Sequence, residues 1–431
     1  MSTNQVKRYA IVGLGGRSRF YYQALAGQYR ETSQIVGFCD INYTRMNYAN
    51  KVLAEKFGYP PVKTYHAYDF ERMIEETKPD IVIVTSIDRT HDRYIVSAMN
   101  LGCDVITEKP MTIDEVRCQK ILDTVKATGR QLRVTFNYRY APYNTKIREL
   151  IMNDAIGEVN SVHFEWLLNT THGADYFRRW HRDKRNSGGL LVHKATHHFD
   201  LVNFWLGTRP KIVFAMGDLM FYGRENAEKR GIRNLYYRAY GSENAKDDPF
   251  ALHLEKNPQL TQMYLEAEAE DGYLRDQSVF GDGISIEDTM AVMVRYENRA
   301  MMTYSLNAYL PWEGYRVAFN GTKGRIEAEV REASYINAGS NASVEGVVKS
   351  KNITVYPMFG EPYVVPVEEA KGGHGGGDPK LLEDLFGEKR PDPFNRAASH
   401  IDGAYSILTG IAANKSIQTG LPVRIDDLVK F

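Results

Sequence analysis

The first third of the chain alternates strand-like with helix-like patterns, and this alternation limits the fold more than any other feature. Residues 81–85 (IVIVT) form an apolar, β-branched run of the kind found in strands that are buried on both faces of a sheet. Charged segments with helical spacing separate such runs, for example residues 69–77 and 112–126. The other strand-like runs are residues 9–13, 35–39, 104–107 and 132–136. The pattern predicts successive βαβ units and a doubly wound parallel sheet.

The pattern changes after residue 139, where strand-like runs follow one another with few helices between them. These runs are residues 159–167, 211–218, 289–296, 301–306, 316–320 and 324–329. They predict an α/β domain on an open, mostly antiparallel sheet with helices on one face. We therefore expect a first domain over residues 1–137 and a second over residues 138–431. A polar stretch at about 222–285, rich in Tyr and Leu and containing EAEAED, predicts an ordered insertion or an oligomer arm.

Charge and composition exclude several classes of protein. The 54 Lys and Arg residues are balanced by 54 Asp and Glu residues, so the chain lacks the basic surplus that a nucleic-acid partner requires. Its 3 cysteines form no CxxC pair, which favours a reducing compartment. No apolar run approaches the roughly 20 residues of a membrane helix, and the first strand-like run begins too early for a signal peptide to precede it. We expect a cytoplasmic protein without nucleic-acid or membrane partners.

A glycine-rich turn directly follows the first strand-like run. The segment from Gly13 to Ser18 approximates GxGxxG, so its backbone amides can approach a pyrophosphate at a helix N-terminus, although a plain strand–helix turn reads similarly. Asp40 closes the second strand about 20 residues later, where a carboxylate binds both ribose hydroxyls and repels a 2′-phosphate. The pattern predicts NAD as the cofactor. The expected cofactor-binding residues are Gly13, Gly15, Gly16, Arg17, Ser18, Asp40, Arg45, Thr85, His91, Glu108 and Lys109.

Two further segments carry candidate acid–base groups. Lys109 follows the strand 104–107 at the sheet edge where ligands bind, and a buried lysine there can assist proton transfer; it also reads as a surface lysine paired with Glu108. In the segment 188–200, helical spacing places His193, His197 and Asp200 on one face beside a diglycine. This face suits proton transfer, a metal, or simply buried hydrogen-bonded histidines.

These segments together resemble the Gfo/Idh/MocA oxidoreductase family over nearly the whole chain. Further motifs of the resemblance are Asn137-Tyr138-Arg139, Ile156-Gly157-Glu158-Val159, Glu287-Asp288, residues 320–324, residues 412–417 and residues 420–423. The resemblance implies an N-terminal Rossmann domain, a C-terminal α/β domain, and assembly into a homodimer or homotetramer. It also implies NAD-dependent hydride transfer to or from a hydroxyl-bearing carbon of a small carbohydrate, namely a sugar, polyol or glycoside.

The resemblance also implies roles for single residues. Lys109 matches the family's active-site lysine, which would polarise the reacting oxygen, and His197 matches its acid–base histidine. His193 stands where the family usually has an aspartate, so a carboxylate of the proton relay is missing there. We keep Lys109, His197 and His193 as catalytic candidates and expect no metal in the leading interpretation. Asp200 is expected to support the helix or to orient His197.

A glycine-rich segment, residues 372–378, resembles the family's glycosidase branch, which holds NAD tightly and recycles it. It raises an alternative function, a glycosidase or lyase, with a metal-assisted variant on His193 and His197; a non-catalytic cofactor-binding sensor is the third. A flexible loop in which His374 has no role would show the same sequence pattern. The basic run 178–185 could bind an anionic substituent of the substrate or the cofactor phosphates of a neighbouring subunit. We favour a third interpretation, a loop exposed to solvent. The expected substrate-binding residues are Tyr138, Arg139, Trp180, Asp200 and His374.

Overall fold

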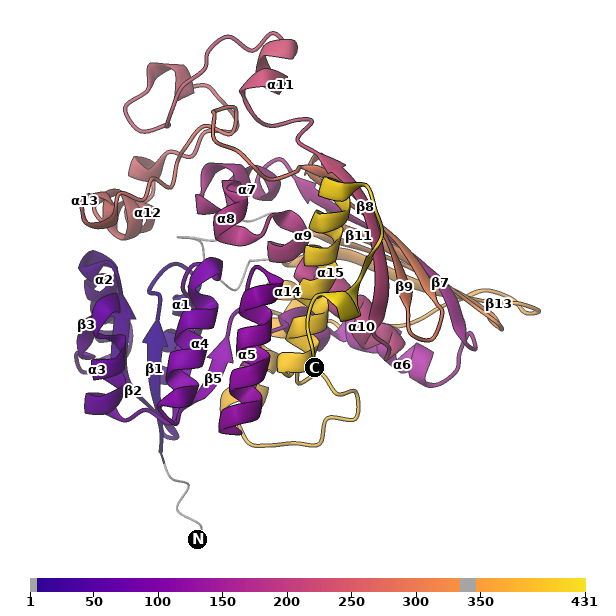
Figure 1. Cartoon of the computed structure of the whole chain (residues 1–431), viewed down its shortest axis with the longest axis horizontal. Coiled ribbons are helices and arrows are strands. Elements are labelled where there is room, and N and C mark those ends of the chain that lie inside the picture. Colours follow the sequence, from indigo (N-terminus) through magenta and orange to yellow (C-terminus); the bar gives the residue numbers. More distant parts are fainter. Residues whose placement is uncertain (1–5, 334–345) are drawn as a thin grey trace.

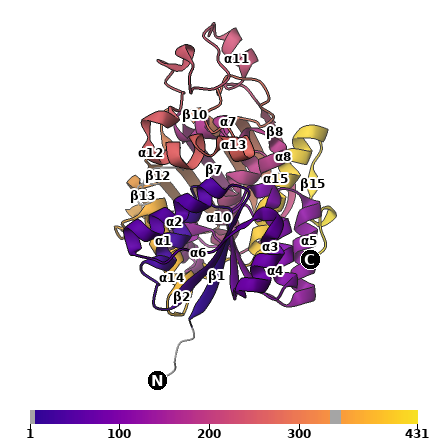
Figure 2. The ribbon, with the colours of Figure 1, turned by 90° about the vertical axis from the view of Figure 1, so that its left-hand side faces the viewer.

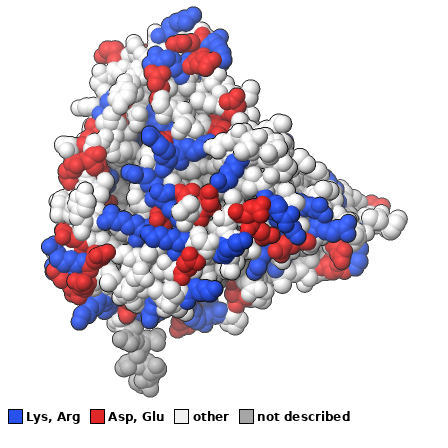
Figure 3. Space-filling model, in the orientation of Figure 1, with Lys and Arg blue, Asp and Glu red and all other residues white. Residues whose placement is uncertain are grey.

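A computed structural model describes residues 6–333 and 346–431 of the chain. The first five residues, which the expectation about a signal peptide includes, lie outside this part. Among the described residues, no helix combines the length and apolar character needed to cross a membrane. Figure 3 shows basic and acidic side chains side by side over the visible face, in keeping with their equal numbers.

The first sheet is parallel and has six strands in the order β3-β2-β1-β4-β5-β6. The strands are β1 (Lys7–Val12), β2 (Ser33–Asp40), β3 (Thr64–His66), β4 (Ile81–Val84), β5 (Asp104–Thr107) and β6 (Leu132–Val134). Five helices accompany them, namely α1 (Ser18–Ala26), α2 (Tyr43–Phe57), α3 (Phe70–Thr77), α4 (His91–Asn100) and α5 (Glu115–Thr128). Five of the six strands lie where the sequence predicts them. Strand β3 is missed because three residues are too few to show a pattern.

The second sheet has nine strands in the order β14-β13-β12-β11-β7-β10-β9-β8-β15. The strands are β7 (Val159–Asn169), β8 (Pro210–Asp218), β9 (Thr289–Tyr296), β10 (Met301–Leu310), β11 (Glu313–Gly321), β12 (Gly324–Glu332), β13 (Val348–Pro357), β14 (Tyr363–Val364) and β15 (Val423–Arg424). Neighbours pair antiparallel except β7 with β10, which are parallel. One face carries α6 (Pro142–Met152), α10 (Ala195–Leu206) and α15 (His400–Thr419) (Figures 1 and 2). The fold is therefore the expected α/β class, with a parallel sheet followed by a mostly antiparallel one.

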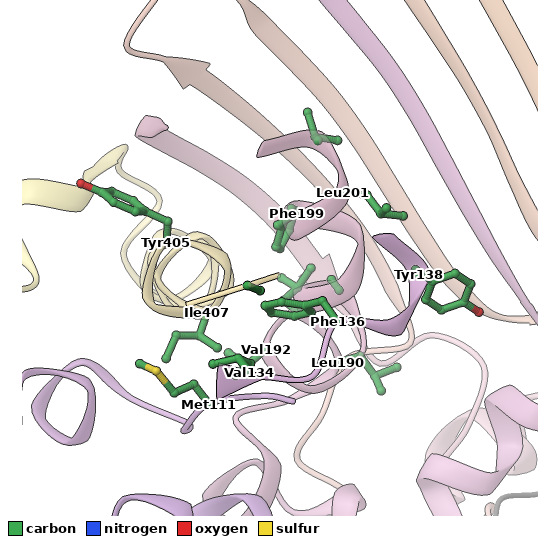
Figure 4. Packing of buried hydrophobic residues seen from close by; sticks show 14 of the residues in the cluster. Met111, Val134, Phe136, Tyr138, Leu190, Val192, Phe199, Leu201, Tyr405 and Ile407 are labelled. Atoms are coloured by element: carbon green, nitrogen blue, oxygen red, sulfur yellow. The ribbon is translucent and has the colours of Figure 1, made fainter. Parts of the chain in front are cut away.

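Helix α15 joins the two sheets and fixes the short helix α9 (Leu190–His193). We call the part of the chain with the six-stranded sheet the first unit and the part with the nine-stranded sheet the second unit. Figure 4 shows Ile407 of α15 in one apolar cluster with Val134 and Phe136 of the first unit and Val192 of α9. A Cβ on Gly410 would lie 2.1 Å from the carbonyl oxygen of Leu191, so only glycine lets the two helices approach this closely. This packing sets where α9 presents His193.

The segment between β8 and β9 is an ordered insertion, as expected. It contains α11 (Arg224–Lys229), α12 (Pro258–Leu260) and α13 (Glu268–Asp271) and forms its own small apolar cluster, which reaches Tyr48 of α2. Figures 1 and 2 both show α12 and α13 beside α2 of the first unit. We call residues 258–271 the clasp. The expected dimer or tetramer stays a prediction.

Candidate functional site

A deep cleft lies at the carboxyl ends of β1, β4 and β5, between the two sheets. Its walls come from the glycine loop after β1, the turn after β4, α9, the clasp and the loop that opens α14 (Gly373–Phe386). Ten of the eleven predicted cofactor-binding residues line it, namely Gly13, Gly15, Gly16, Arg17, Asp40, Arg45, Thr85, His91, Glu108 and Lys109. Ser18 lies behind the loop, where its hydroxyl donates to the Gly15 carbonyl at 2.7 Å.

The glycine loop is shaped for a ligand that approaches its backbone. Gly13 has a φ of +85°, and a Cβ there would lie 2.4 Å from the backbone nitrogen of Ser86, so a side chain is excluded. The Thr85 hydroxyl donates to the Gly13 carbonyl at 2.6 Å and fixes the turn. The Gly16 amide points to the cleft and donates to the hydroxyl of Tyr264 in the clasp at 3.0 Å. These backbone groups fit a pyrophosphate.

Asp40 is buried at the end of β2 and is held by backbone amides. Its two oxygens accept from the amides of Leu14 and Asn42. Burial raises the pKa of Asp40, while Arg45 and these amides favour the charged form. Each oxygen accepts one of these bonds and keeps a second lone pair, so the carboxylate fits the ribose hydroxyls of NAD.

Glu108 and His91 form part of the cleft wall, and both side chains are hydrogen-bonded to other groups of the protein. Glu108 accepts from Arg17 Nε and from the Tyr21 hydroxyl, both at 2.6 Å. His91 places its two ring nitrogens 2.8 Å from the Pro110 carbonyl and 3.0 Å from the Ser86 carbonyl. These bonds hold together the turns that follow β4 and β5, which carry the cleft's reactive groups.

Lys109 is the candidate base or acid at the floor of the cleft. Its Nζ donates to the His193 carbonyl at 3.2 Å, which ties the end of β5 to α9. Burial lowers the pKa of Lys109 to about 8, against the opposing effect of Asp88 and Glu108. The amine therefore changes charge near neutral pH, as proton transfer requires. The alternative of an ordinary surface lysine is wrong, because Glu108 pairs with Arg17 instead.

The carboxylate that the sequence lacks beside His193 comes from the other unit. Asp88, in the short turn after β4, lies 2.5 Å from His193 Nδ1. Burial lowers the pKa of His193 well below its usual value, and Lys109 and Arg179 lower it further. The pair is made by residues far apart in the sequence, so no local pattern indicates it.

His197 is buried at the start of α10 with its ring against aromatic edges. Its centroid lies 5.0 Å from that of Tyr138 and 5.8 Å from that of Phe136. Its Nδ1 has no hydrogen-bond partner among the described residues. Burial, reinforced by Lys109 and Lys194, lowers the pKa of His197 well below its usual value, so the ring is neutral. A neutral imidazole in the cleft wall can hydrogen-bond a substrate hydroxyl.

Hydrogen bonds and close packing hold the glycine-rich segment with His374 against the first unit. His374 Nδ1 lies 2.9 Å from Asp378, and the Asn137 amide donates to the same carboxylate at 2.7 Å. A Cβ on Gly377 would lie 2.3 Å from the Asn137 carbonyl oxygen, so the loop packs tightly on the end of the first unit. His374 lines the cleft, with its ring 6.5 Å from that of His197.

Three predicted substrate-binding residues lie behind the cleft instead of lining it. Arg139 is buried and forms a two-point ion pair with Asp200 at 2.6 and 2.7 Å, and it also reaches Asp402 at 3.0 Å. The Tyr138 hydroxyl donates to buried Glu332 at 2.8 Å. These three side chains therefore make internal contacts instead of the expected substrate contacts. Their hydrogen-bonding groups already have partners within the protein and do not face the cleft. Asp200 supports α10, as the sequence also allows.

The basic run 178–185 is largely not solvated, which corrects the favoured interpretation. Asp175 accepts from Arg178, Arg179 and Arg275, and its pKa falls below the usual range because these cations outweigh the effect of burial. Arg179 and Trp180 line the cleft. Trp180 stacks on His181 with the ring centroids 3.5 Å apart. Of the five predicted substrate residues, Trp180 and His374 are therefore the two in the cleft.

Several residues of the cleft were missed by the sequence-based predictions. They are Asp88, Lys194, Arg179, His181 and Tyr264. Lys194, Arg179 and His181 had a signal, since each lies within a segment that the sequence analysis singles out, but Asp88 and Tyr264 enter the cleft only through tertiary contacts. Within residues 6–333 and 346–431, no group of three His, Cys, Asp or Glu side chains is arranged to hold a metal ion.

A dinucleotide-type glycine loop, a ribose-side carboxylate, a partly buried lysine and a buried histidine thus share one cleft, which defines a nicotinamide-dependent oxidoreductase. The chain belongs to the Gfo/Idh/MocA oxidoreductase family. Residues 7–136 match the family's NAD-binding Rossmann fold, and residues 148–425 match its C-terminal alpha/beta domain. The cofactor is NAD.

Known proteins resemble the chain over different lengths. The protein YteT of Bacillus subtilis (strain 168) is 36% identical over 449 residues, covering 99% of both chains. The D-glucoside 3-dehydrogenase of Escherichia coli (strain K12) is 28% identical over 207 residues, 48% of this chain and 55% of the relative. The glycosyl hydrolase family 109 protein 1 of Akkermansia muciniphila is 28% identical over 194 residues, 43% of this chain and 40% of the relative.

Solved structures share the fold at low identity. The aldose-aldose oxidoreductase from Caulobacter crescentus has a TM-score of 0.62 at 17% identity, covering 97% of this chain and 100% of its own. An oxidoreductase from Agrobacterium radiobacter, solved with NAD+, has a TM-score of 0.62 at 14% identity and covers 99% of this chain and 100% of its own. Both show that the two-unit architecture is shared.

Proposed function

We propose that the protein transfers a hydride between NAD and a hydroxyl-bearing carbon of a sugar, polyol or glycoside. The observation that carries the proposal is that Lys109 and His197 both line the cleft that holds the glycine loop. The dehydrogenases among the relatives act on carbohydrates by name, which supports this substrate class. Trp180 lines the same cleft and offers an aromatic face for a sugar ring.

The residues of the cleft fit NAD, and the protein must accept the proton that the substrate hydroxyl loses. Gly16 and its neighbours would hold the pyrophosphate, and Asp40 the adenosine ribose. Bound NAD supplies a hydride acceptor, so a hydroxyl proton must leave as the carbon is oxidised. The chain's own contribution is therefore to bind the alcohol, orient it and accept that proton.

Electrostatics favours Lys109 over His197 as the proton acceptor. Burial, Lys109 and Lys194 all lower the pKa of His197, so a proton on this ring is disfavoured. A proton on Lys109 is instead stabilised by Asp88 and Glu108. We therefore infer that neutral Lys109 accepts the hydroxyl proton and that neutral His197 positions the hydroxyl. This assignment exchanges the two roles that the family resemblance implies.

Asp88 and His193 act through Lys109. The His193 carbonyl accepts from Lys109 Nζ, while its ring is held by Asp88 at 2.5 Å. The pair thus holds the amine in place between the two units. We assign Asp88 and His193 as positioning residues rather than catalytic ones.

The test is turnover and cofactor binding in two variants. Lys109→Ala and His197→Ala are each expected to lower kcat on the true substrate by about 10²–10⁴-fold, the usual contribution of one acid–base group. The Kd for NAD+ is expected to stay within about 3-fold of the parent value, since neither side chain belongs to the pyrophosphate or ribose contacts.

Lys120→Ala, an exposed lysine on α5, serves as the matched control and should change neither quantity. Near-normal turnover of either cleft variant on a glycoside that the parent oxidises would refute the assignment.

A second function, a glycosidase or lyase that recycles NAD, is favoured by one observation. The Asn137–Asp378–His374 chain of hydrogen bonds aims a fixed histidine at the cleft close to His197. The partial likeness to a glycosyl hydrolase family 109 protein points the same way. Incubation with aryl glycosides separates the two functions, because recycling releases the aglycone without accumulating NADH.

A further inference from the structure

The clasp crosses from the second unit to the first and contacts the cofactor half of the cleft. The side-chain amide of Asn42 donates to the Ala267 carbonyl at 2.9 Å, and Lys51 Nζ donates to the side chain of Gln262 at 2.9 Å. Tyr264 accepts from the Gly16 amide, as described above. Together these contacts run from the glycine loop along α2, the helix that follows Asp40 (Figure 2).

The clasp brings two carboxylates next to the residues that contact the 2′ substituent of the adenosine ribose in a Rossmann cofactor site. Asp271 pairs with Arg45, whose side chain is 10% exposed, and both residues line the cleft. Arg45 also acts electrostatically on Asp40. Arg45 therefore interacts electrostatically with two carboxylates, one from each unit.

Glu270 occupies the N-terminus of α2 beside this ion pair. It accepts from the backbone amides of Tyr43 at 2.5 Å and Thr44 at 3.0 Å, and from the Thr44 hydroxyl. Free amides at the start of a helix attract phosphate, as does a nearby arginine. The clasp thus covers both groups that would otherwise bind a 2′-phosphate after β2.

We propose that the acidic end of the clasp, Glu270 and Asp271, makes the cofactor site reject NADP. Asp40 alone repels a 2′-phosphate, but Arg45 and the start of α2 offset that repulsion when they are free. The two clasp carboxylates cancel this attraction and add their own negative charge. Discrimination between NAD and NADP then depends on two carboxylates of the second unit, on the other side of the cleft, as well as on Asp40 at the end of β2. The inference rests on the cofactor site itself and is independent of the carbohydrate substrate.

The test measures dinucleotide binding rather than turnover. Isothermal titration calorimetry with NAD+ and with NADP+ gives the two Kd values. It is applied to the purified full-length parent and to the Glu270→Gln, Asp271→Asn double variant. We expect the Kd for NADP+ to fall by about 30-fold or more, as removal of two nearby charges allows, with the Kd for NAD+ changing by less than about 3-fold. Adding Arg45→Ala to the double variant should abolish the gain.

Glu268→Gln is the matched control, because this residue lies on the same short helix but pairs with Arg238 inside the insertion. It should leave both Kd values unchanged. Asp271→Asn alone keeps the Glu270 contacts and should give a smaller gain, so it remains informative if the double variant folds poorly.

An unchanged NADP+ affinity in either folded variant, or equal gains for both dinucleotides, would overturn the inference while leaving the cofactor site intact. Failure of the parent chain to bind NAD+ would remove both the proposed function and this inference.

Discussion

The lowered pKa of Lys109 makes a quantitative prediction about pH. Burial brings this pKa from 10.5 to about 8, which corresponds to a cost of roughly 3 kcal/mol for the protonated form. The amine is charged below about pH 8 and neutral above it. If the neutral amine accepts the hydroxyl proton, about a tenth of the enzyme is active at pH 7 and about nine tenths at pH 9.

The expected result is a rise in kcat/KM for alcohol oxidation of about tenfold between pH 7 and pH 9, with an apparent pKa near 8. Asp88→Asn removes a carboxylate that raises the pKa of Lys109, so the rise should move to lower pH. Lys109→Arg keeps a permanent cation and should be inactive at every pH, because arginine does not deprotonate in this range.

The assay is initial-rate NADH formation at saturating NAD+ across this pH range, with the NAD+ affinity measured at each pH. A flat profile between pH 7 and pH 9, or a profile that falls, would refute the assignment of Lys109 as the acceptor. A shift to higher pH in Asp88→Asn would refute the stated electrostatic coupling between the two side chains.

Three other perturbations follow from the contacts. Gly13→Ala places a methyl group 2.4 Å from the Ser86 backbone, so NAD+ affinity in a fluorescence titration should fall by at least about 100-fold; an unchanged Kd would contradict the close approach. Arg139→Met leaves buried Asp200 without its cation and should cost about 3–5 kcal/mol in denaturant unfolding; a loss below about 1 kcal/mol would mean the pair is not structural. Trp180→Ala should raise KM for substrate by about tenfold with kcat little changed, and a fall in kcat alone would show a different role.

The sequence by itself determined the features that depend on neighbouring residues. The strand runs, the glycine turn after β1 and Asp40 at the end of β2 are all visible in it, because strand patterning and turn chemistry are local. The position of Lys109 at the end of β5 follows from the same logic. Together with the motifs of the second half that carry the family resemblance, these features were enough to predict the fold class, the family and NAD as the cofactor.

Tertiary structure decided which side chains meet. Tyr138 and Arg139 follow the first sheet, as a cleft residue would, but they face Glu332 and Asp200 in the interior. Burial of a charge is tolerated only when a partner is supplied, and that partner comes from a distant element. A run of polar residues therefore does not reveal whether it faces ligand, water or an internal ion pair.

The contacts behind the proposed roles of Lys109 and of the clasp both cross between the units. Asp88 supplies the carboxylate that the segment around His193 lacks, and the clasp supplies the carboxylates that engage Arg45 and the start of α2. Each pair joins residues more than a hundred positions apart, and no periodicity or spacing encodes such a distance. The packing of the second unit on the first determines these contacts, because only the folded chain brings the two walls of the cleft together.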